Sequence, residues 1–190
     1  MATHVMIDIE TLGTGVDSVI ASIGAVQFNP KTGHVAKNGF EALLSVEDGC
    51  KLGFKMDCDT VAWWQGQSDE ARKQLDGDVL VRSAILQFMA WLNGLCDKDD
   101  LRVWGNGPTF DLALLIYHFD RMDYELPWGF RGERCVRTLV ELGRANDIDP
   151  KKTIEFVGVK HSALDDAKHQ AKYVSAIWQA LGLVDKVEAA

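Results

Sequence analysis

Long hydrophobic runs are missing from this sequence. No stretch approaches the roughly 20 apolar residues that a membrane-spanning helix needs. The first apolar run, in MATHVMIDIE, is interrupted by the charged Asp8, which is not the pattern of a secretory signal. The sequence therefore predicts a soluble protein without a membrane partner, and we expect a cytoplasmic location.

Cysteine is scarce and irregularly spaced. The four cysteines form no CxxC pair and no spaced framework; they are Cys50, Cys58, Cys96 and Cys135. Isolated thiols of this kind usually serve as small core side chains. We therefore assign the cysteines no chemistry.

Positive charge is also in short supply, since 20 lysines and arginines stand against 28 aspartates and glutamates, for a net charge of −8. Phosphate contacts normally require lysine and arginine, so this balance argues against a protein that coats nucleic acid or grips long duplexes. It argues less against an enzyme whose acids hold cations, because those cations attract phosphate themselves. Arg131, Arg134 and Arg137 form the tightest basic cluster, with Lys151 and Lys152 further on; these residues either follow a phosphate backbone or solvate a surface.

The residues that are present indicate an α/β fold. At 190 residues and 47% hydrophobic content, the chain can bury one core, and we expect a single domain over residues 1–185. Three strands separated by short turns predict an antiparallel meander, and helices enclosing one more strand complete a mixed sheet. Expected strands cover residues 4–9, 19–29, 39–45 and 101–104, and expected helices cover 60–75, 79–95, 109–119, 134–146 and 162–181.

Two carboxylates stand at the end of the first expected strand. Asp8 and Glu10 are two residues apart, so their side chains point to the same face. Like charges this close repel unless a cation or a shared proton lies between them. Oxygen ligands of this kind suit Mg²⁺ or Mn²⁺. Taken alone, however, such a pair is more often a solvated strand end.

The segment GNGPTFD, residues 105–111, ends on a third carboxylate. Its glycines and Pro108 turn the chain out of a strand, and Asp111 falls near the start of a helix. An acid in that position ordinarily complements the helix dipole. The glycine-rich turn would also let a substrate approach the backbone closely.

The segment HSALDDA, residues 161–167, combines a histidine with a further carboxylate. Ser162 has the position of a helix N-cap, which places Asp166 in the first helical turn and His161 just before the helix. An imidazole can accept a proton from water near neutral pH. A lone exposed histidine usually has no such role, so this motif gains weight only together with the other two.

In this order, the three motifs resemble the DEDDh branch of the DEDD exonuclease superfamily, whose pattern is DxE, an Asn-containing turn that closes on Asp, and His-x4-Asp. Here they read DIE, GNGPTFD and HSALDD, and they span most of the chain, from Asp8 to Asp166. The segments MIDIETLG, TVAWW, WGNGPTFD, RCVRTL and HSALDDA are most similar to a small group of bacterial and phage 3′-5′ exoribonuclease domains. The resemblance implies a ribonuclease-H-like fold with a five-stranded mixed sheet flanked by α-helices.

The resemblance also implies a metal-dependent release of nucleoside 5′-monophosphates from a 3′ end. Asp8, Glu10 and Asp166 would hold one Mg²⁺ or Mn²⁺ ion. Asp8 would bridge to a second ion, which Asp111 would support. Two such ions can stabilise both the attacking and the leaving oxygen of the displacement. His161 would accept the proton of the attacking water, so five catalytic residues are expected, of which the four acids are metal ligands.

Residues around the motifs are expected to bind the terminal nucleotide. In similar enzymes the positions after DxE and the Asn-containing turn contact the end of the strand. The corresponding residues are Thr11, Leu12, Asn106 and Phe110. Core packing explains Leu12 and Phe110 equally well.

The adjacent tryptophans Trp63 and Trp64 cannot face one surface, since neighbours on a helix lie about 100° apart. Trp64 falls on the apolar stripe of the expected helix and is predicted in the core. Trp63 either stacks on a base of the nucleic acid or packs in a protein interface. The tryptophan pair and the apolar content suggest a symmetric homodimer.

Other functions stay open on the same motifs. RNA is favoured by the resemblance to exoribonuclease domains, but the sequence offers no clear test for the 2′-hydroxyl group, so a DNA exonuclease is an alternative. A metal phosphoesterase for free nucleotides is another. A non-catalytic binding module would lack a ligand or the base, whereas all five positions are present. The shortage of positive charge favours short strands or 3′ overhangs.

Overall fold

A mixed β-sheet forms the centre of the molecule. The computed structural model describes residues 2–107 and 109–183. The strand order is β3-β2-β1-β5-β6, and β4 also pairs with β2. β1 and β2 are antiparallel, whereas β5 is parallel to both β1 and β6, so the predicted α/β fold with a mixed sheet is confirmed. The strands are β1 (Thr3–Thr11), β2 (Ile20–Asn29), β3 (His34–Val35), β4 (Phe40–Leu43), β5 (Leu101–Gly105) and β6 (Glu133–Cys135).

The outer edge of β2 explains why the described sheet has six strands and not the five expected. β3 and β4 both pair with β2, at different levels: Val35 pairs with Phe28, and Phe40 pairs with Ala25. The two short strands therefore share one position in the strand order, interrupted at residues 36–39. That order has five positions, as the resemblance implies.

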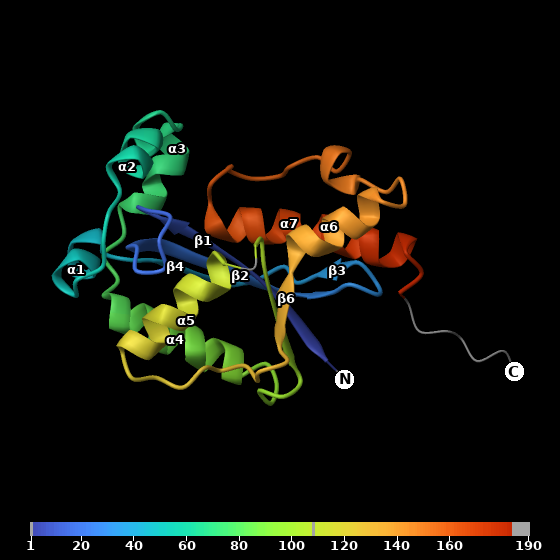
Figure 1. The fold of residues 1–190 in the computed structure, drawn as a ribbon, viewed down its shortest axis with the longest axis horizontal. Coiled ribbons are helices and arrows are strands. Elements are labelled where there is room, and N and C mark those ends of the chain that lie inside the picture. Colours follow the sequence, from blue (N-terminus) through green and yellow to red (C-terminus); the bar gives the residue numbers. More distant parts are fainter. Residues whose placement is uncertain (1, 108, 184–190) are drawn as a thin grey trace, which may run out of the picture.

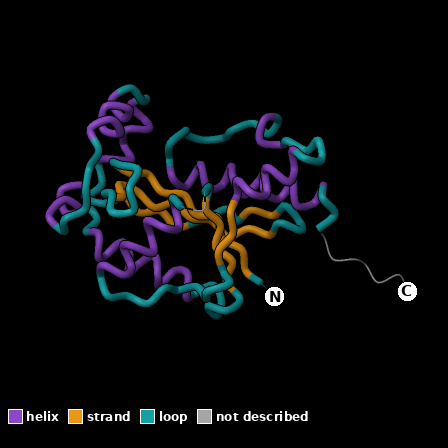
Figure 2. Tube along the Cα trace, in the orientation of Figure 1, coloured by secondary structure: helices purple, strands orange, loops and turns teal. Residues whose placement is uncertain are grey.

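Helices cover both faces of the sheet (Figures 1 and 2). In Figure 1, α6 and α7 lie on one face, α4 and α5 lie on the other, and α1 to α3 gather beyond one end of the sheet. No helix in the described part of the chain is long and apolar enough to cross a membrane. The helices are α1 (Val46–Lys51), α2 (Cys58–Gln65), α3 (Asp69–Arg72), α4 (Val81–Asn93), α5 (Asp111–Arg121), α6 (Val136–Arg144) and α7 (Ala163–Ala180), with 3₁₀ helices η1 (Lys73–Leu75) and η2 (Pro150–Lys152).

The central strand β1 separates two cores. Val5, Ile7 and Ile9 belong to the core that includes buried side chains of α4 and α5, whereas Met6 belongs to the core that includes α6 and α7. Because successive side chains of a strand point to opposite faces, Asp8 and Glu10 lie on the face of Met6. Both acids therefore point to the side of the sheet that α7 covers.

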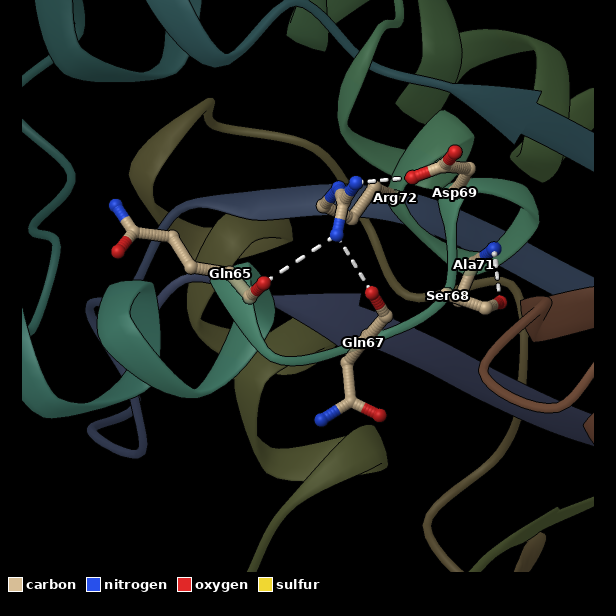
Figure 3. A network of polar contacts seen from close by, with 6 residues as sticks. All are labelled: Gln65, Gln67, Ser68, Asp69, Ala71 and Arg72. Atoms are coloured by element: carbon tan, nitrogen blue, oxygen red, sulfur yellow. Dashed lines mark hydrogen bonds and ion pairs between the residues drawn. The ribbon is translucent and has the colours of Figure 1, made fainter.

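The prediction of one helix over residues 60–75 is wrong. α2 ends at Gln65 with Gly66 as its C-cap, and α3 begins after Ser68, whose hydroxyl caps the new helix. Arg72 donates hydrogen bonds to the carbonyls of Gln65 and Gln67 and so holds the corner between the two helices (Figure 3). Glycine is a poor helix former and serine a good N-cap, so the local chemistry favours this corner over a continuous helix.

Two further elements differ from the prediction. The helix expected from Arg134 begins at Val136, because residues 133–135 pair with β5 as strand β6. The short helix α1, which Ser45 caps, was not predicted. The other predicted elements end within two residues of the observed bounds. Residues 1, 108 and 184–185 of the predicted domain lie outside the described residues.

Candidate active site

The side chains of Asp8 and Glu10 project from the same face of β1, close to the first turn of α7. Gly24 of β2 stands opposite Asp8 in the sheet. A Cβ atom on Gly24 would lie 2.1 Å from the backbone of Ala163, so glycine is what lets α7 rest directly on the sheet. This close approach brings Asp166 to the two acids of β1.

Asp111 joins the site from the end of β5. It lies at the start of a helix, near which it was predicted, as the first residue of α5, and is only 2% exposed. The backbone N–H of Asn106 donates a hydrogen bond of 2.7 Å to Oδ2 of Asp111. A Cβ atom on Gly105 would lie 3.2 Å from that of Asp111, so glycine gives the returning chain room to place this carboxylate at the strand end.

His161 and Asp166 frame the start of α7. His161 has a left-handed backbone conformation, with φ of 64°, and its N–H donates a hydrogen bond of 2.7 Å to Oδ2 of Asp166. Ser162 occupies the predicted N-cap position, but its hydroxyl makes no capping hydrogen bond. The N–H of Ala163 donates instead to Oε1 of the buried Gln74, 3.3 Å away in η1. The 3₁₀ helix η1 therefore helps to hold the start of α7.

All five predicted catalytic residues line one cavity of about 270 Å³. Ligand atoms of Glu10, His161 and Asp166 all lie within 4.8 Å of one another, which is close enough to hold a metal ion. The complete lining consists of Asp8, Ile9, Glu10, Asn106, Phe110, Asp111, Arg137, His161, Asp166 and Gln170. Segments that are far apart in the sequence thus converge on a single acidic site.

The carboxylates of the site resist ionisation, because Asp111 is buried and Asp8, Glu10 and Asp166 are half-buried. Burial, reinforced by the charges of Asp166 and Asp111, raises the pKa of Glu10 to about 9. Burial and the charges of Asp111, Glu10 and Asp166 raise the pKa of Asp8 well above its ordinary range. Burial also raises the pKa of Asp111 to about 6 and that of Asp166 above its usual value. A divalent cation would relieve both the desolvation and the repulsion of the ionised acids.

A larger cavity of about 420 Å³ adjoins the acidic one. The two cavities share Ile9, Glu10 and Phe110 in their walls. Thr11 also lines the larger cavity, although its hydroxyl donates a hydrogen bond of 2.7 Å to the carbonyl of Gly13. A molecule in the larger cavity would therefore reach the carboxylate of Glu10 directly.

Both tryptophans of α2 line this larger cavity, in different ways. Trp64 is 2% exposed, as predicted, and its indole N–H donates a hydrogen bond of 2.9 Å to the carbonyl of Thr11. Trp63 is 46% exposed, and its ring lies edge to face against His161, with 4.9 Å between the ring centroids. Trp63 thus connects the larger cavity with the histidine of the acidic site.

The predicted substrate-binding residues separate into two groups. Thr11, Trp63, Asn106 and Phe110 each line at least one of the two cavities. Leu12 is 4% exposed, packs in the core and lines neither cavity. For Leu12 the structure therefore supports the packing alternative, because a buried side chain has no surface to offer a base. Pro108 of the predicted turn lies outside the described residues.

Sequence reasoning missed Gln170. This residue is 5% exposed, and its side-chain amide donates a hydrogen bond of 2.7 Å to Oδ1 of Asp8. Its Oε1 atom is buried and has no hydrogen-bond partner among the described residues. Gln170 follows Asp166 by four positions, so both side chains lie on one face of α7. That four-residue spacing is the sequence signal that could have placed Gln170 next to the acidic site.

The sequence matches a known family over most of its length. The family described as "3'-5' exoribonuclease Rv2179c-like domain" matches residues 3–178. The chain is also 27% identical over 212 residues to an exodeoxyribonuclease of Enterobacteria phage T4, covering 95% of this chain and 91% of the phage protein.

Solved structures share the fold. The nuclease domain of 3'hExo, described as a DEDDh family member bound to rAMP, has a TM-score of 0.64 at 15% identity, and the match covers 94% of this chain and 92% of that one. Exonuclease I of E. coli, in complex with a dT13 oligonucleotide, has a TM-score of 0.68 at 16% identity, with 96% of this chain and 42% of that chain covered. These likenesses confirm the predicted fold.

Proposed function

We infer the function from the family, because the chain belongs to the 3′-5′ exoribonuclease Rv2179c-like domains and is thus a 3′-5′ exonuclease of the DEDDh type. We propose that it releases nucleoside 5′-monophosphates from the 3′ end of single strands or overhangs. The preferred polymer in this proposal is RNA. One observation carries this proposal. Four carboxylates and one histidine from three distant segments line a single cavity. A non-catalytic binding module would have no need of the complete set.

The carboxylate cluster fits divalent cations. Its donors are oxygen atoms, which Mg²⁺ and Mn²⁺ prefer, and the acids of the cluster are buried close together. We assign Asp8, Glu10 and Asp166 to one ion, and Asp8 with Asp111 to a second. When bound, the ions would supply the positive charge that stabilises the attacking and leaving oxygens of an in-line displacement.

His161 is assigned the role of general base. The backbone N–H of His161 is tied to Asp166, and its ring packs against Trp63, so the imidazole is held beside the acids. From there it accepts a proton from the water whose oxygen attacks phosphorus. The bond between phosphorus and the O3′ atom of the preceding nucleotide breaks, and O3′ takes up a proton. A positioned base of this kind contributes on the order of 10² to 10⁴ in rate.

The larger cavity is assigned to the 3′-terminal nucleoside. Trp63 and Phe110 offer it aromatic surfaces, and stacking on an aromatic side chain accepts any base. Thr11 and Glu10 also line this cavity, whereas Asn106 lines the acidic cavity. A cavity that adjoins the acids on one side supports trimming from an end over cleavage within a strand.

DNA is the second candidate substrate. It is favoured by the relative from phage T4, which is named an exodeoxyribonuclease. The reaction at phosphorus is the same for both polymers, so the distinction depends on contacts with the sugar.

Three further expectations accompany the proposal. We propose that residues 1–185 act as one exonuclease domain. A cytoplasmic location is supported by the four free cysteines, Cys50, Cys58, Cys96 and Cys135. The homodimer stays a prediction that has lost its support, because Trp64 is buried and Trp63 lines a cavity.

The test uses RNA and DNA oligonucleotides of one sequence, labelled at the 5′ end, in Mg²⁺, in Mn²⁺ and in excess chelator. We expect a ladder of single-nucleotide steps from the 3′ end, faster on RNA, that disappears with chelator. The Asp8→Asn variant, purified in the same way, controls for contaminating nucleases. Intact oligonucleotides in both metals, or cleavage that persists in chelator, would refute the proposal, and a faster DNA ladder would select the second candidate.

A further inference from the structure

A third cavity adjoins the acidic one through residues that do not line the larger aromatic cavity. It has a volume of about 370 Å³ and shares Asn106 and Arg137 with the acidic cavity. The larger aromatic cavity shares Ile9, Glu10 and Phe110 with the acidic one. The aromatic, acidic and third cavities therefore follow one another in a row, with the acids in the middle.

The third cavity is basic in a protein that is acidic overall. Its lining consists of Asn106, Arg137, Val140, Glu141, Arg144 and Lys151. Three of these side chains are cationic, and one is anionic. The net charge of the whole chain is −8, so the excess of cationic over anionic side chains in the third cavity is opposite in sign to the charge of the protein.

The cations of the third cavity come from three different places in the fold. Arg137 and Arg144 lie at the two ends of α6, and Lys151 lies in η2. Among the described residues the Arg137 side chain makes no hydrogen bond or ion pair. Its charge lowers the pKa of Asp111, and it lines both the acidic cavity and the third one. Arg144 also pairs with Asp149, 3.0 Å away, and the ammonium group of Lys151 lies 5.7 Å from the ring centre of Tyr173. These contacts place both side chains without neutralising Lys151.

We propose that this basic cavity, formed by Arg137, Arg144 and Lys151, binds the backbone phosphate of the nucleotide that precedes the scissile bond. The inference rests on the proposed function, because it extends the same site. With the 3′-terminal nucleoside in the aromatic cavity and the scissile phosphate at the acids, the preceding nucleotide needs a path away from both, and the third cavity adjoins the acidic one. The only anions that a nucleic-acid strand offers there are its backbone phosphates, and arginine and lysine are the side chains that bind them.

The test compares two substrates that differ in reach. A nucleoside 5′-monophosphate p-nitrophenyl ester fills the aromatic cavity and the acidic site, but it has no preceding nucleotide. A single-stranded pentanucleotide extends into the basic cavity. Arg144→Ala and Lys151→Ala each remove one cation from that cavity and leave the five catalytic residues intact. Lys152→Ala is the control for Lys151→Ala, because Lys152 is the neighbour of Lys151 in η2, carries the same charge and does not line the cavity. Lys152 pairs with Asp149, 3.1 Å away, which also pairs with Arg144, so it is not the control for Arg144→Ala.

We expect each cavity variant to raise KM for the pentanucleotide about 10-fold, as for the loss of one charge-assisted phosphate contact. The dependence of log KM on log salt concentration should become shallower by about 0.7 for each lost contact with a single strand. Rates on the ester should stay within about two-fold of wild type. Lys152→Ala should change neither the salt dependence nor the KM by a comparable amount.

Two results would overturn the inference. A pentanucleotide KM and salt dependence that match wild type in the Arg144→Ala and Lys151→Ala variants would show that no phosphate binds there. Equal losses on the ester and the pentanucleotide would place the two cations in the reaction itself. Melting temperatures identify a variant that fails to fold. If Arg144→Ala fails to fold, the Lys151→Ala variant, which breaks no ion pair among the described residues, tests the inference by itself. A wild-type protein that hydrolyses neither substrate would instead refute the proposed function.

Discussion

The half-buried Glu10 of the acidic cluster should destabilise the metal-free protein in a pH-dependent way. Glu10 has a pKa of about 9 in the fold and an ordinary value of 4.5, because burial and the neighbouring acids disfavour its charged form. As the pH rises above 4.5, the unfolded chain ionises at this position while the folded chain stays protonated. Stability is therefore lost steadily between pH 4.5 and about 9.

Glu10→Gln replaces the carboxyl group with a neutral group of similar shape, so the variant escapes this loss. Each pH unit above the ordinary pKa is worth about 1.4 kcal/mol. In chelator, the variant should be more stable than wild type by less than about 1 kcal/mol at pH 5 and by about 3 kcal/mol at pH 7. At this chain length, the difference at pH 7 corresponds to a melting temperature about 6 to 12 °C higher.

The assay is thermal unfolding of both proteins in chelator at pH 5 and pH 7, repeated at pH 7 with Mg²⁺. Glu41 is an exposed glutamate of β4 in the same sheet, and Glu41→Gln is the control. Its melting temperature should differ from that of wild type by the same amount at pH 5 and at pH 7. With Mg²⁺ the order should reverse, because the ionised carboxylate of wild type holds the cation and the amide does not. A Glu10→Gln effect that is the same at both pH values in chelator would refute the reasoning about burial and repulsion.

The remaining predictions concern the two side chains that meet between the aromatic and acidic cavities. His161→Ala should lower turnover by a factor on the order of 10² to 10⁴, and calorimetry should show that Mg²⁺ binding is retained. Loss of Mg²⁺ binding would identify His161 as a metal ligand. Turnover within a few-fold of wild type would show that His161 has no catalytic role. Trp63→Ala should raise KM about 10-fold through lost stacking with little change in melting temperature, whereas the buried Trp64→Ala should cost about 3 to 5 kcal/mol of stability. Equal stability losses in the two tryptophan variants would contradict the assigned roles.

Much of the candidate site followed from local sequence rules. The period of a strand places Asp8 and Glu10 on one face, and the period of a helix separates Trp63 from Trp64. The glycine-rich turn places Asp111 at a helix start, as observed. Local signals competed at the corner after α2, where the apolar stripe predicted one continuous helix. The apolar spacing continues across residues 66–68, but the helical backbone is interrupted there, so the stripe alone gave the wrong prediction.

Contacts between distant segments were decided only by the tertiary structure. The alternation of β1 puts Asp8 and Glu10 on one face but does not tell which helix covers it; Gly24 lets α7 lie on that face and so brings Asp166 to the acids. The burial of Leu12 in the core and the meeting of Arg137 with Lys151 in one cavity have no local signature either. The physical reason is that side-chain periodicity is a property of neighbouring residues, whereas burial and charge proximity depend on which surfaces pack together once the chain has folded.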